Sequence, residues 1–489
     1  MTFRIISLLL LLMTFNRGHS QYVITNNLRI AWDNILELKL DSALGYIETE
    51  ELSNPPNLFS FYYRHYVHFL DALISGDHAE YEQFNEGSEI LTKAIRDSDP
   101  HYPEYLYFLS SMHLQMAFLN IYHGDHWQGI RNLIVAYRMA GQNSQNWPDF
   151  NPNLKIEGIT ELLISSVPEN FKWIFNWLGM KAELQEAIGK LEEFYLKCSP
   201  DEKPEALIIL SLAYGQFLPD KERAYRILKD ETKEYLNKAM VRLVMAFYAS
   251  KTGHAPEAVR LLESDNQPGK IRCDQAVLLL GITKLNMLEE DAGRYLEYFL
   301  DHYKGINLVR TACHKLSWHY LIEGDTVLYI NFKQMVLSEG SDLLVIDKQA
   351  TAEASENSMP DLHLLKTRLL FDAGMYDRAF EILNNMSVNM LDSERDKIEY
   401  TYRYARVCHK LSMIDKAKEL YRKVISEDGD SDAYFAPYSA LQLGIIAELE
   451  GNYEEAGTFY KICLEINRGQ YRQGIAREAK IRLDRLKDH

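Results

Sequence analysis

Residues Ala440–Tyr460, with the sequence ALQLGIIAELEGNYEEAGTFY, decide the fold. Small and aromatic residues recur at helical spacing on both sides of Gly451, which predicts two helices that meet at this glycine. Gly444 and Ala456 lie 12 residues apart, one on each predicted helix, where small side chains let the helices approach closely. The aromatic residues that we expect to fill the space around them are Tyr453 and Tyr460.

This stretch resembles the tetratricopeptide motif, in which a small residue, a turn glycine, an alanine and an aromatic residue stand at fixed positions of a helical hairpin. The motif's tryptophan is replaced by Ala440 and its closing proline by Arg468, and neither loss threatens the hairpin. The resemblance implies an all-α fold, a right-handed α-solenoid of irregular tetratricopeptide-like hairpins.

Further copies of the pattern precede this one at irregular spacing: the step from Leu212 to Ala246 is 34 residues, and that from Ala405 to Gly444 is 39. The residues that define the clearest copies are Ala246, Gly253, Ala258, Gly374, Ala379, Ala405, Ala417, Gly444, Gly451, Ala456 and Tyr460. Another copy contains Ala117, Gly124 and Gly129, and weaker ones pair Ala31 with Ala43, Leu212 with Ala224 and Gly281 with Gly293. Such a series on a strand-poor chain predicts a helical repeat protein.

Turn-rich breaks at 53–57, 141–153 and 338–360 predict how the array is divided. We expect a signal peptide over 1–20, N-terminal repeats over 21–140, central repeats over 154–337 and C-terminal repeats with a capping helix over 361–489. The segment 349–356 is polar, and we expect it to be an exposed insertion. The apolar face of the last helix, expected to cap the array, consists of Ile475, Ala479, Leu483 and Leu486.

The first twenty residues have the pattern of a cleavable signal peptide: Arg4 precedes an apolar run from Ile5 to Phe15, and small residues follow. This run is shorter than the roughly 20 residues that span a bilayer. We expect cleavage before Gln21 and no transmembrane segment after it. The mature protein is expected to be soluble and periplasmic, or otherwise associated with the cell envelope.

The composition fits a folded protein, with 47% hydrophobic and 25% charged residues in 489. A net charge of −17 repels nucleic acid and anionic membranes, so we expect no nucleic-acid partner and a preference for basic or neutral ligands. The five cysteines are far apart and odd in number, which predicts no disulfide framework.

Motifs of catalytic or metal sites are missing: the chain has no His-Glu-x-x-His, Cys-x-x-Cys, Gly-x-Ser-x-Gly or glycine-rich Lys-Ser/Thr loop. We therefore expect no enzyme activity and no cofactor. The nearest approach to a metal site is the pair His65 and His68, which share a helix face and are followed by Asp71. The aromatic residues around them favour a packed helix over a metal site.

The resemblance implies a function, because tetratricopeptide proteins take a peptide or a partner helix in a concave groove lined by the first helix of each hairpin. We expect an envelope scaffold that binds protein or peptide partners, with Arg242, Arg403 and Gln442 as groove contacts. One alternative is capture of a carbohydrate or small ligand on tyrosine and tryptophan platforms, among them Trp127, Trp147, Trp173, Trp177 and Trp318. Another is an enzyme whose site is dispersed along the chain, recognisable by a pocket with convergent histidines and carboxylates.

Overall fold

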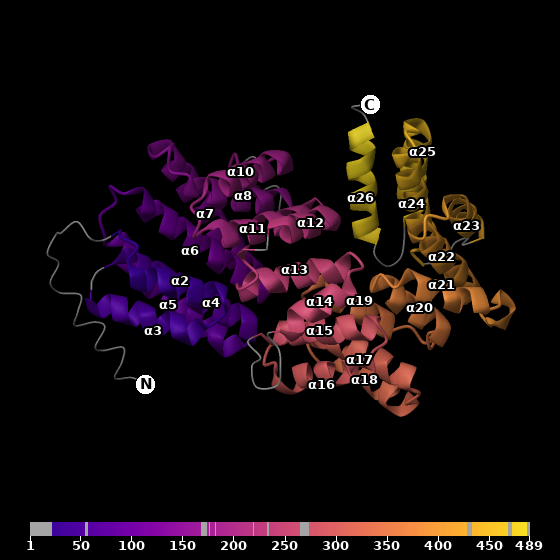
Figure 1. Cartoon of the computed structure of the whole chain (residues 1–489). Helices are drawn as coiled ribbons and strands as arrows, with labels where there is room; N and C mark the ends of the chain where they lie inside the picture. Colours follow the sequence, from indigo (N-terminus) through magenta and orange to yellow (C-terminus); the bar gives the residue numbers. More distant parts are fainter. Residues whose placement is uncertain are drawn as a thin grey trace. The chain divides into compact units, whose positions relative to one another are not determined.

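A computed structural model describes residues 22–53, 57–167, 174–175, 177–180, 182–218, 220–231, 234–264, 273–427, 433–467 and 472–486. The predicted signal peptide, Trp173 and Arg468 lie outside the described residues. Within them the chain forms helices and no strand, which confirms the all-α prediction (Figure 1). None of the described helices is both long and apolar enough to cross a membrane.

The chain divides into two compact units at residue 203. The first unit holds the residues up to 203, except that 74–78 and 122–124 belong with the second unit, which continues from 204 to 489. The expected break at 141–153 lies inside the first unit, and the division into three repeat blocks stays a prediction.

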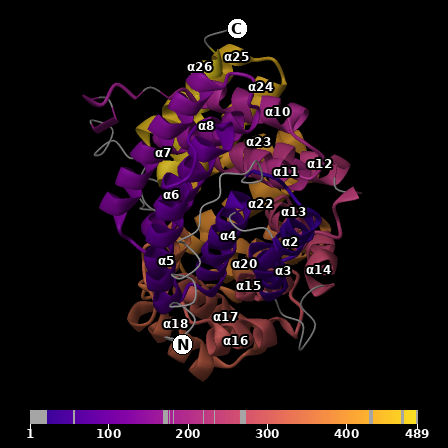
Figure 2. The same cartoon turned by 90° about the vertical axis from the view of Figure 1, so that its left-hand side faces the viewer.

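Helices α7, α8 and α10 of the first unit lie side by side in both views (Figure 1, Figure 2). The helices of this unit are α2 (Asn26–Leu36), α3 (Leu40–Ser53), α4 (Leu58–Ser75), α5 (His78–Arg96), α6 (Pro103–Tyr122), α7 (His126–Asn146), α8 (Pro152–Ser165) and α10 (Leu184–Lys197). The α6–α7 pair has the small-residue contact that the sequence predicts: a Cβ atom on Gly129 would lie 3.1 Å from the Ala117 carbonyl oxygen. Phe108, fully buried, stacks on Tyr62 with ring centroids 4.7 Å apart.

Successive helices of the second unit pack as hairpins: α13 with α14, α15 with α16, α17 with α18, α20 with α21, α22 with α23 and α24 with α25. The elements are α11 (Lys203–Leu212), η2 (Ala213–Phe217), α12 (Lys221–Glu231), α13 (Ala239–Lys251), α14 (Ala255–Glu263), α15 (Asp274–Asn286), α16 (Ala292–His302), α17 (Val309–Glu323), α18 (Thr326–Ser338), α19 (Val345–Ala354), α20 (Leu362–Asp372), α21 (Tyr376–Asn385), η4 (Val388–Met390), α22 (Glu394–Lys410), α23 (Ile414–Glu427), α24 (Phe435–Leu449), α25 (Tyr453–Glu465) and α26 (Arg472–Arg485).

The α24–α25 hairpin shows why the motif works. A Cβ atom on Gly444 would come within 2.4 Å of the Tyr460 ring, so only glycine lets this fully buried ring lie against α24. Gly451 turns the chain at φ +79°, in the left-handed region that favours glycine. Tyr453 was expected in this core but is 42% exposed, because it is the first residue of α25 and lies at the turn between the two helices.

The same arrangement recurs at the other predicted positions. The alanines that define the earlier copies are completely buried between their helices: Ala246, Ala258, Ala379, Ala405 and Ala417. The turn glycines Gly253 and Gly374 both have φ +79°. The hairpins are therefore tetratricopeptide-like in their small-residue contacts as well as in their helix order.

Two hairpins that are not neighbours in sequence touch at their turns. A Cβ atom on Gly374 would lie 1.8 Å from the Gly253 carbonyl oxygen, and the Ala255 amide donates to the Ala373 carbonyl oxygen at 3.4 Å. The α13–α14 turn thus lies against the α20–α21 turn, although α15 to α19 separate them in sequence. In an evenly stacked array only adjacent repeats make contact, so the second unit is wound more tightly than such an array.

Helix α19 corrects the prediction of an exposed insertion at 349–356. Its Ala350 and Ala354 pack on Cys313 and Val336 in a small apolar cluster. Asp347 is completely buried. Its carboxylate accepts hydrogen bonds from two amides at the start of α17, those of Leu308 at 2.7 Å and Thr311 at 2.9 Å. A polar sequence is buried here because its small residues fit closely and its carboxylate is fully hydrogen-bonded.

The last helix, α26, packs through the face that the sequence indicates. Ile475 and Ala479 are buried against Ala440 and Ala456, with Leu483 and Leu486 partly buried beside them. On another side of α26, the Arg477 guanidinium donates to the Phe217 carbonyl oxygen at 2.7 Å. The C-terminal helix thus covers the end of the α24–α25 hairpin and also contacts η2.

Candidate functional site

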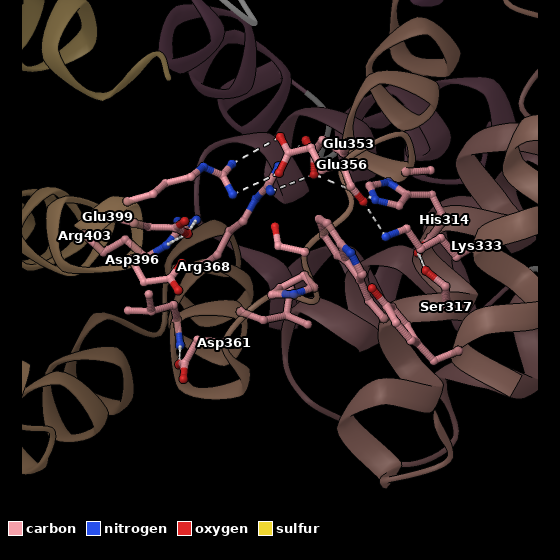
Figure 3. A pocket seen from close by; sticks show the side chains of 18 of the residues that line it. His314, Ser317, Lys333, Glu353, Glu356, Asp361, Arg368, Asp396, Glu399 and Arg403 are labelled. Carbon is pink, nitrogen blue, oxygen red and sulfur yellow. Dashed lines mark hydrogen bonds and ion pairs between the residues drawn. The ribbon is translucent and has the colours of Figure 1, made fainter. Parts of the chain in front are cut away.

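A pocket that is partly open to solvent lies among α17, α18, α19, α20 and α22 of the second unit (Figure 3). Three of these five helices, α17, α20 and α22, are first helices of hairpins. The charged and titratable side chains that line it are His314, Lys333, Glu353, Glu356, Asp361, Arg368, Arg395, Asp396, Glu399 and Arg403. Histidine and carboxylates therefore do converge here, which is the feature named above for a dispersed enzyme site.

Glu353 of α19 is the most strongly held of these groups. Both of its oxygens accept hydrogen bonds from Arg368 at 2.9 Å, and His314 Nε2 lies 3.8 Å from Oε2 (Figure 3). Burial alone would raise the pKa of Glu353, but the Arg368 guanidinium holds it well below its usual range. Burial lowers the pKa of His314 to about 3. At neutral pH the glutamate is ionised and the histidine is neutral.

Glu356, just after α19, fixes another wall of the pocket. Its carboxylate accepts one hydrogen bond from Arg395 of α22 at 3.1 Å and forms an ion pair with the same guanidinium at 2.9 Å. Its backbone carbonyl oxygen accepts a hydrogen bond from Lys333 of α18 at 2.6 Å. The segment that closes the pocket is thus tied to the helices on both sides by charge-assisted hydrogen bonds.

Of the three groove contacts predicted from sequence, the pocket contains only Arg403. This side chain is 4% exposed and donates from Nε to Glu399 Oε1 at 2.7 Å. Arg242 donates to the Leu236 carbonyl oxygen near the start of its own helix, and Gln442 is half-buried on α24. The sequence pattern identified first helices correctly but could not tell which turn of each helix faces the pocket.

Trp318 is covered by two cations rather than free to stack on a ligand. The Arg368 guanidinium carbon lies 4.7 Å and Lys315 Nζ 3.6 Å from its ring centroid, and the side chain is 3% exposed. Among the other candidate platforms, Trp127, Trp147 and Trp177 are exposed on the first unit, at 66%, 39% and 81%. The described pocket therefore offers no open tryptophan face to a sugar ring.

Ser317, His314 and Glu353 are the residue types of a hydrolytic triad, but their geometry differs from one. The Ser317 hydroxyl donates to the His314 backbone carbonyl oxygen at 2.8 Å and makes no hydrogen bond with the imidazole. The glutamate forms its strong hydrogen bonds with Arg368 instead of orienting the histidine. A nucleophile activated by a general base requires the hydroxyl to face the ring nitrogen.

The weak metal candidate, His65 of α4, is engaged on both nitrogens. Its Nδ1 lies 2.6 Å from Gln115 Oε1, and its Nε2 lies 2.9 Å from Ser88 Oγ. His65 is 1% exposed, whereas its candidate partner His68 is half-buried. The described part of the chain contains no group of three histidine, cysteine or carboxylate side chains placed to hold a metal ion. His65 thus belongs to a buried hydrogen-bond network of the first unit.

No protein-family profile matches the chain, and no curated protein sequence matches it. Among solved structures the chain is similar to a monomeric mutant of IFIT1 with Gppp-AAAA, at 14% identity and a TM-score of 0.37, over 92% of this chain and 91% of that one. It is also similar to the human IFIT1 dimer with m7Gppp-AAAA, at 13% identity and a TM-score of 0.36, over 92% and 91%.

A third similar structure is the Cut9–Hcn1 hetero-tetramer of the APC/C, at 12% identity and a TM-score of 0.23, over 95% of this chain and 96% of that one. Scores this low say nothing about what this chain binds. The tetratricopeptide-like assignment rests on the chain's own hairpins, above all on Gly444 against Tyr460 and the completely buried alanines.

Proposed function

We propose that this protein is an exported, non-catalytic binding protein that holds an extended segment of a partner protein in the pocket of its second unit. The pocket of Figure 3 carries the proposal. It is lined by polar side chains from several hairpins, and an extended peptide has backbone N–H and C=O groups that need such partners. Paired side chains such as Arg395 and Glu356 can also donate to and accept from a peptide at their exposed edges.

The state of the titratable groups supports binding over catalysis. A general base works best when its pKa lies near the operating pH, and burial lowers the pKa of His314 to about 3. The negative charge of Glu353 is balanced by Arg368, and the Ser317 hydroxyl donates a hydrogen bond to a backbone carbonyl oxygen. The pocket holds its charges in place without leaving one poised to move a proton.

Export is part of the proposal and rests on the pattern of the first twenty residues. Expression of the full chain with a C-terminal tag, followed by cell fractionation and intact-mass measurement, tests it. We expect an envelope fraction whose chain begins at Gln21. Recovery of the unprocessed chain from the cytoplasm would contradict export without touching the binding role.

The binding role is tested by affinity capture from a native envelope extract, with the intact chain and two variants as baits. Arg395→Glu reverses a charge at the pocket wall, where the side chain is 46% exposed. Arg422→Glu on α23 is the matched control, because it breaks a similarly exposed pair with Glu455, 3.3 Å away, outside the pocket.

We expect one or two stoichiometric proteins on the wild-type and Arg422→Glu baits and a loss of at least about tenfold on Arg395→Glu, the usual effect of reversing a central interface charge. Equal retention by both variants would exclude the pocket as the binding site. A wild-type bait with no protein partner would contradict the scaffold role and favour a glycan or metabolite.

A further inference from the structure

Three cationic side chains of the second unit lack a carboxylate partner. Lys251 ends α13, Lys315 lies on α17 and Arg406 lies on α22. Among the described residues none of the three has an ion pair, whereas the neighbouring Arg368 and Arg403 are paired with Glu353 and Glu399. Lys251 is exposed and Lys315 and Arg406 are half-buried, so part of each side chain is open to solvent.

The contact between distant turns brings these cations to one face. Gly253 follows Lys251 by two residues, and Gly374 follows Asp372 by two, so the packing of the two glycines places the end of α13 beside the end of α20. Arg406 reaches the same end of α20, since its guanidinium carbon lies 3.8 Å from the Phe371 ring centroid. Lys315 of α17 joins them, because it lies over the Trp318 ring together with Arg368 of α20.

Aromatic rings hold the cations in position. Lys315 Nζ lies 3.6 Å from the Trp318 centroid, and the Arg406 guanidinium lies between Phe371 and Tyr438, 3.8 and 5.4 Å from their centroids. Cation–π contacts orient a charge without neutralising it. The cations thus keep hydrogen-bond donors for another group.

Electrostatic effects show that the charges are close together. Burial, followed by the positive charge of Arg368, lowers the pKa of Lys315 to about 7, and Lys251 adds to the decrease, while Glu353 and Asp372 oppose it. The Asp372 carboxylate also acts on Lys251 and Arg406. No ion pair or hydrogen bond joins Asp372 to any of the three within the described residues. A protonated Lys315 is therefore destabilised by its neighbours, and an anion bound there would stabilise it.

We propose that this face binds a phosphate monoester, with Lys315 and Arg406 as the principal ligands of the phosphoryl group and Lys251 at its rim. Cations outnumber carboxylates on this face, which favours an anion with more than one charge: Asp372 acts on all three cations, and Lys221 adds a further positive charge near Lys251. A phosphate monoester carries a charge of about −1.5 to −2 at neutral pH, whereas a single carboxylate would leave the face positive. Guanidinium and ammonium groups are the donors that phosphate prefers.

The inference rests on the proposed binding role of the second unit, whose pocket is lined by the Trp318 that Lys315 covers, and it names the chemistry of one group that the ligand carries. The monoester can belong to a phosphorylated side chain or to a small metabolite, and the two sources share this recognition. It also changes the expectation from the sequence, where a net charge of −17 favoured basic or neutral ligands. A local positive face on an acidic protein binds anions selectively, because the negative field of the rest of the protein repels anions that do not contact the cations directly.

The test is isothermal titration of the purified full chain with inorganic phosphate, then with O-phosphoserine and glucose 6-phosphate to separate the two sources. Lys315→Met keeps the length of the side chain on Trp318 and removes its charge. Lys416→Met on α23 is the matched control, because Lys416 Nζ also lies over an aromatic ring, 4.2 Å from the Tyr404 centroid. We expect phosphate to bind about tenfold more weakly to Lys315→Met and to Arg406→Gln, and unchanged to Lys416→Met.

A variant that is expected to bind phosphate more tightly distinguishes a lost binding site from a chain that fails to fold. Asp372 is exposed, so Asp372→Asn should fold, make the face more positive by one charge and tighten phosphate binding several-fold. Sulfate should compete with phosphate, and acetate should not. The proposal is overturned if phosphate does not bind, if Asp372→Asn leaves its affinity unchanged, or if acetate competes as well as sulfate. If the chain captures a protein partner but does not bind phosphate, only this inference is refuted. If it binds phosphate but captures no partner, only the protein-scaffold role is refuted.

Discussion

At the scale of single residues, the C-terminal hairpin depends on glycine, because the buried Tyr460 ring occupies the space that a Cβ atom on Gly444 would need. Gly444, Gly451, Ala456 and Tyr460 lie within one hairpin, so their spacing alone determines their contacts. The prediction for Tyr453 was wrong because spacing identifies the face of a helix but not where the neighbouring helix ends. Whether the first residue of a helix is buried depends on where the neighbouring helix ends.

Gly444→Ala should destabilise the C-terminal hairpin, since a Cβ atom there would lie 2.4 Å from the Tyr460 ring. Overpacking of this kind costs about 1–3 kcal/mol. Gly474→Ala on α26 is the control, because its Cβ atom would meet nothing within 4 Å and alanine favours helix by roughly 0.5–1 kcal/mol. Urea unfolding of both variants checks the difference. Similar free energies of unfolding for the two would show that the glycine is not needed for close packing.

His65 makes stability depend on pH. Burial lowers the pKa of His65 to about 3, against 6.5 in the unfolded chain. Between these values the unfolded state binds the extra proton, so stability falls as pH decreases through this window and is fully present above about 6.5. A decrease from pH 6.5 to 5.0 should cost about 2 kcal/mol through this group, from roughly 1.4 kcal/mol per pH unit.

His314, whose pKa burial lowers to about 3, adds an effect of the same sign. His68, His113, His319 and His409 also have pKa values lowered by burial, so His65→Gln should reduce the pH dependence of the unfolding free energy without abolishing it. Chemical denaturation of wild type and variant between pH 5 and 7 measures both slopes. Parallel slopes would mean that His65 is protonated in the folded protein.

At the scale of elements, α19 is the part of the fold that sequence patterns missed. Its buried face consists of Ala350, Ala354 and Asp347, and neither alanine nor aspartate produces the apolar periodicity by which amphipathic helices are recognised. The helix matters for the candidate site, because it supplies Glu353 and leads into Glu356. The polar composition of segment 349–356 led to the prediction that it is exposed, although it forms one wall of the pocket.

Asp347→Asn should loosen α19. The buried carboxylate accepts from the Leu308 and Thr311 amides, and an asparagine would turn an NH₂ group toward one of these donors. Leaving a buried donor unsatisfied costs about 1–3 kcal/mol. The control is Asp325→Asn at the exposed N-cap of α18, where aspartate accepts from the Leu328 amide at 2.9 Å and asparagine caps nearly as well. Hydrogen exchange should accelerate in α19 for Asp347→Asn only, and unchanged protection of α19 would contradict its role as the anchor.

At the scale of the whole molecule, the proposed phosphate-binding face depends on contacts between hairpins that are far apart in the sequence. Lys251, Lys315 and Arg406 come from three hairpins spread over more than 150 residues. They reach one face because the α13–α14 and α20–α21 turns touch, and irregular repeat spacing does not predict how tightly an array winds. The repeat motif could thus predict the hairpins and the first-helix position of Arg403, but not the positive face.

Gly374→Ala tests whether this turn contact holds the face together. Its Cβ atom would lie 1.8 Å from the Gly253 carbonyl oxygen, and its φ of +79° is unfavourable for alanine. Gly324→Ala is a matched control, because Gly324 has φ +84° but meets nothing within 4 Å, so it has the backbone strain of about 1–2 kcal/mol without the clash. Gly374→Ala should therefore be the more destabilised of the two in urea unfolding, and it alone should lose phosphate affinity, since separating the turns moves Lys251 and α20 apart. Equal losses of stability together with unchanged phosphate binding would mean that the cations are placed by the hairpins themselves and not by the contact between turns.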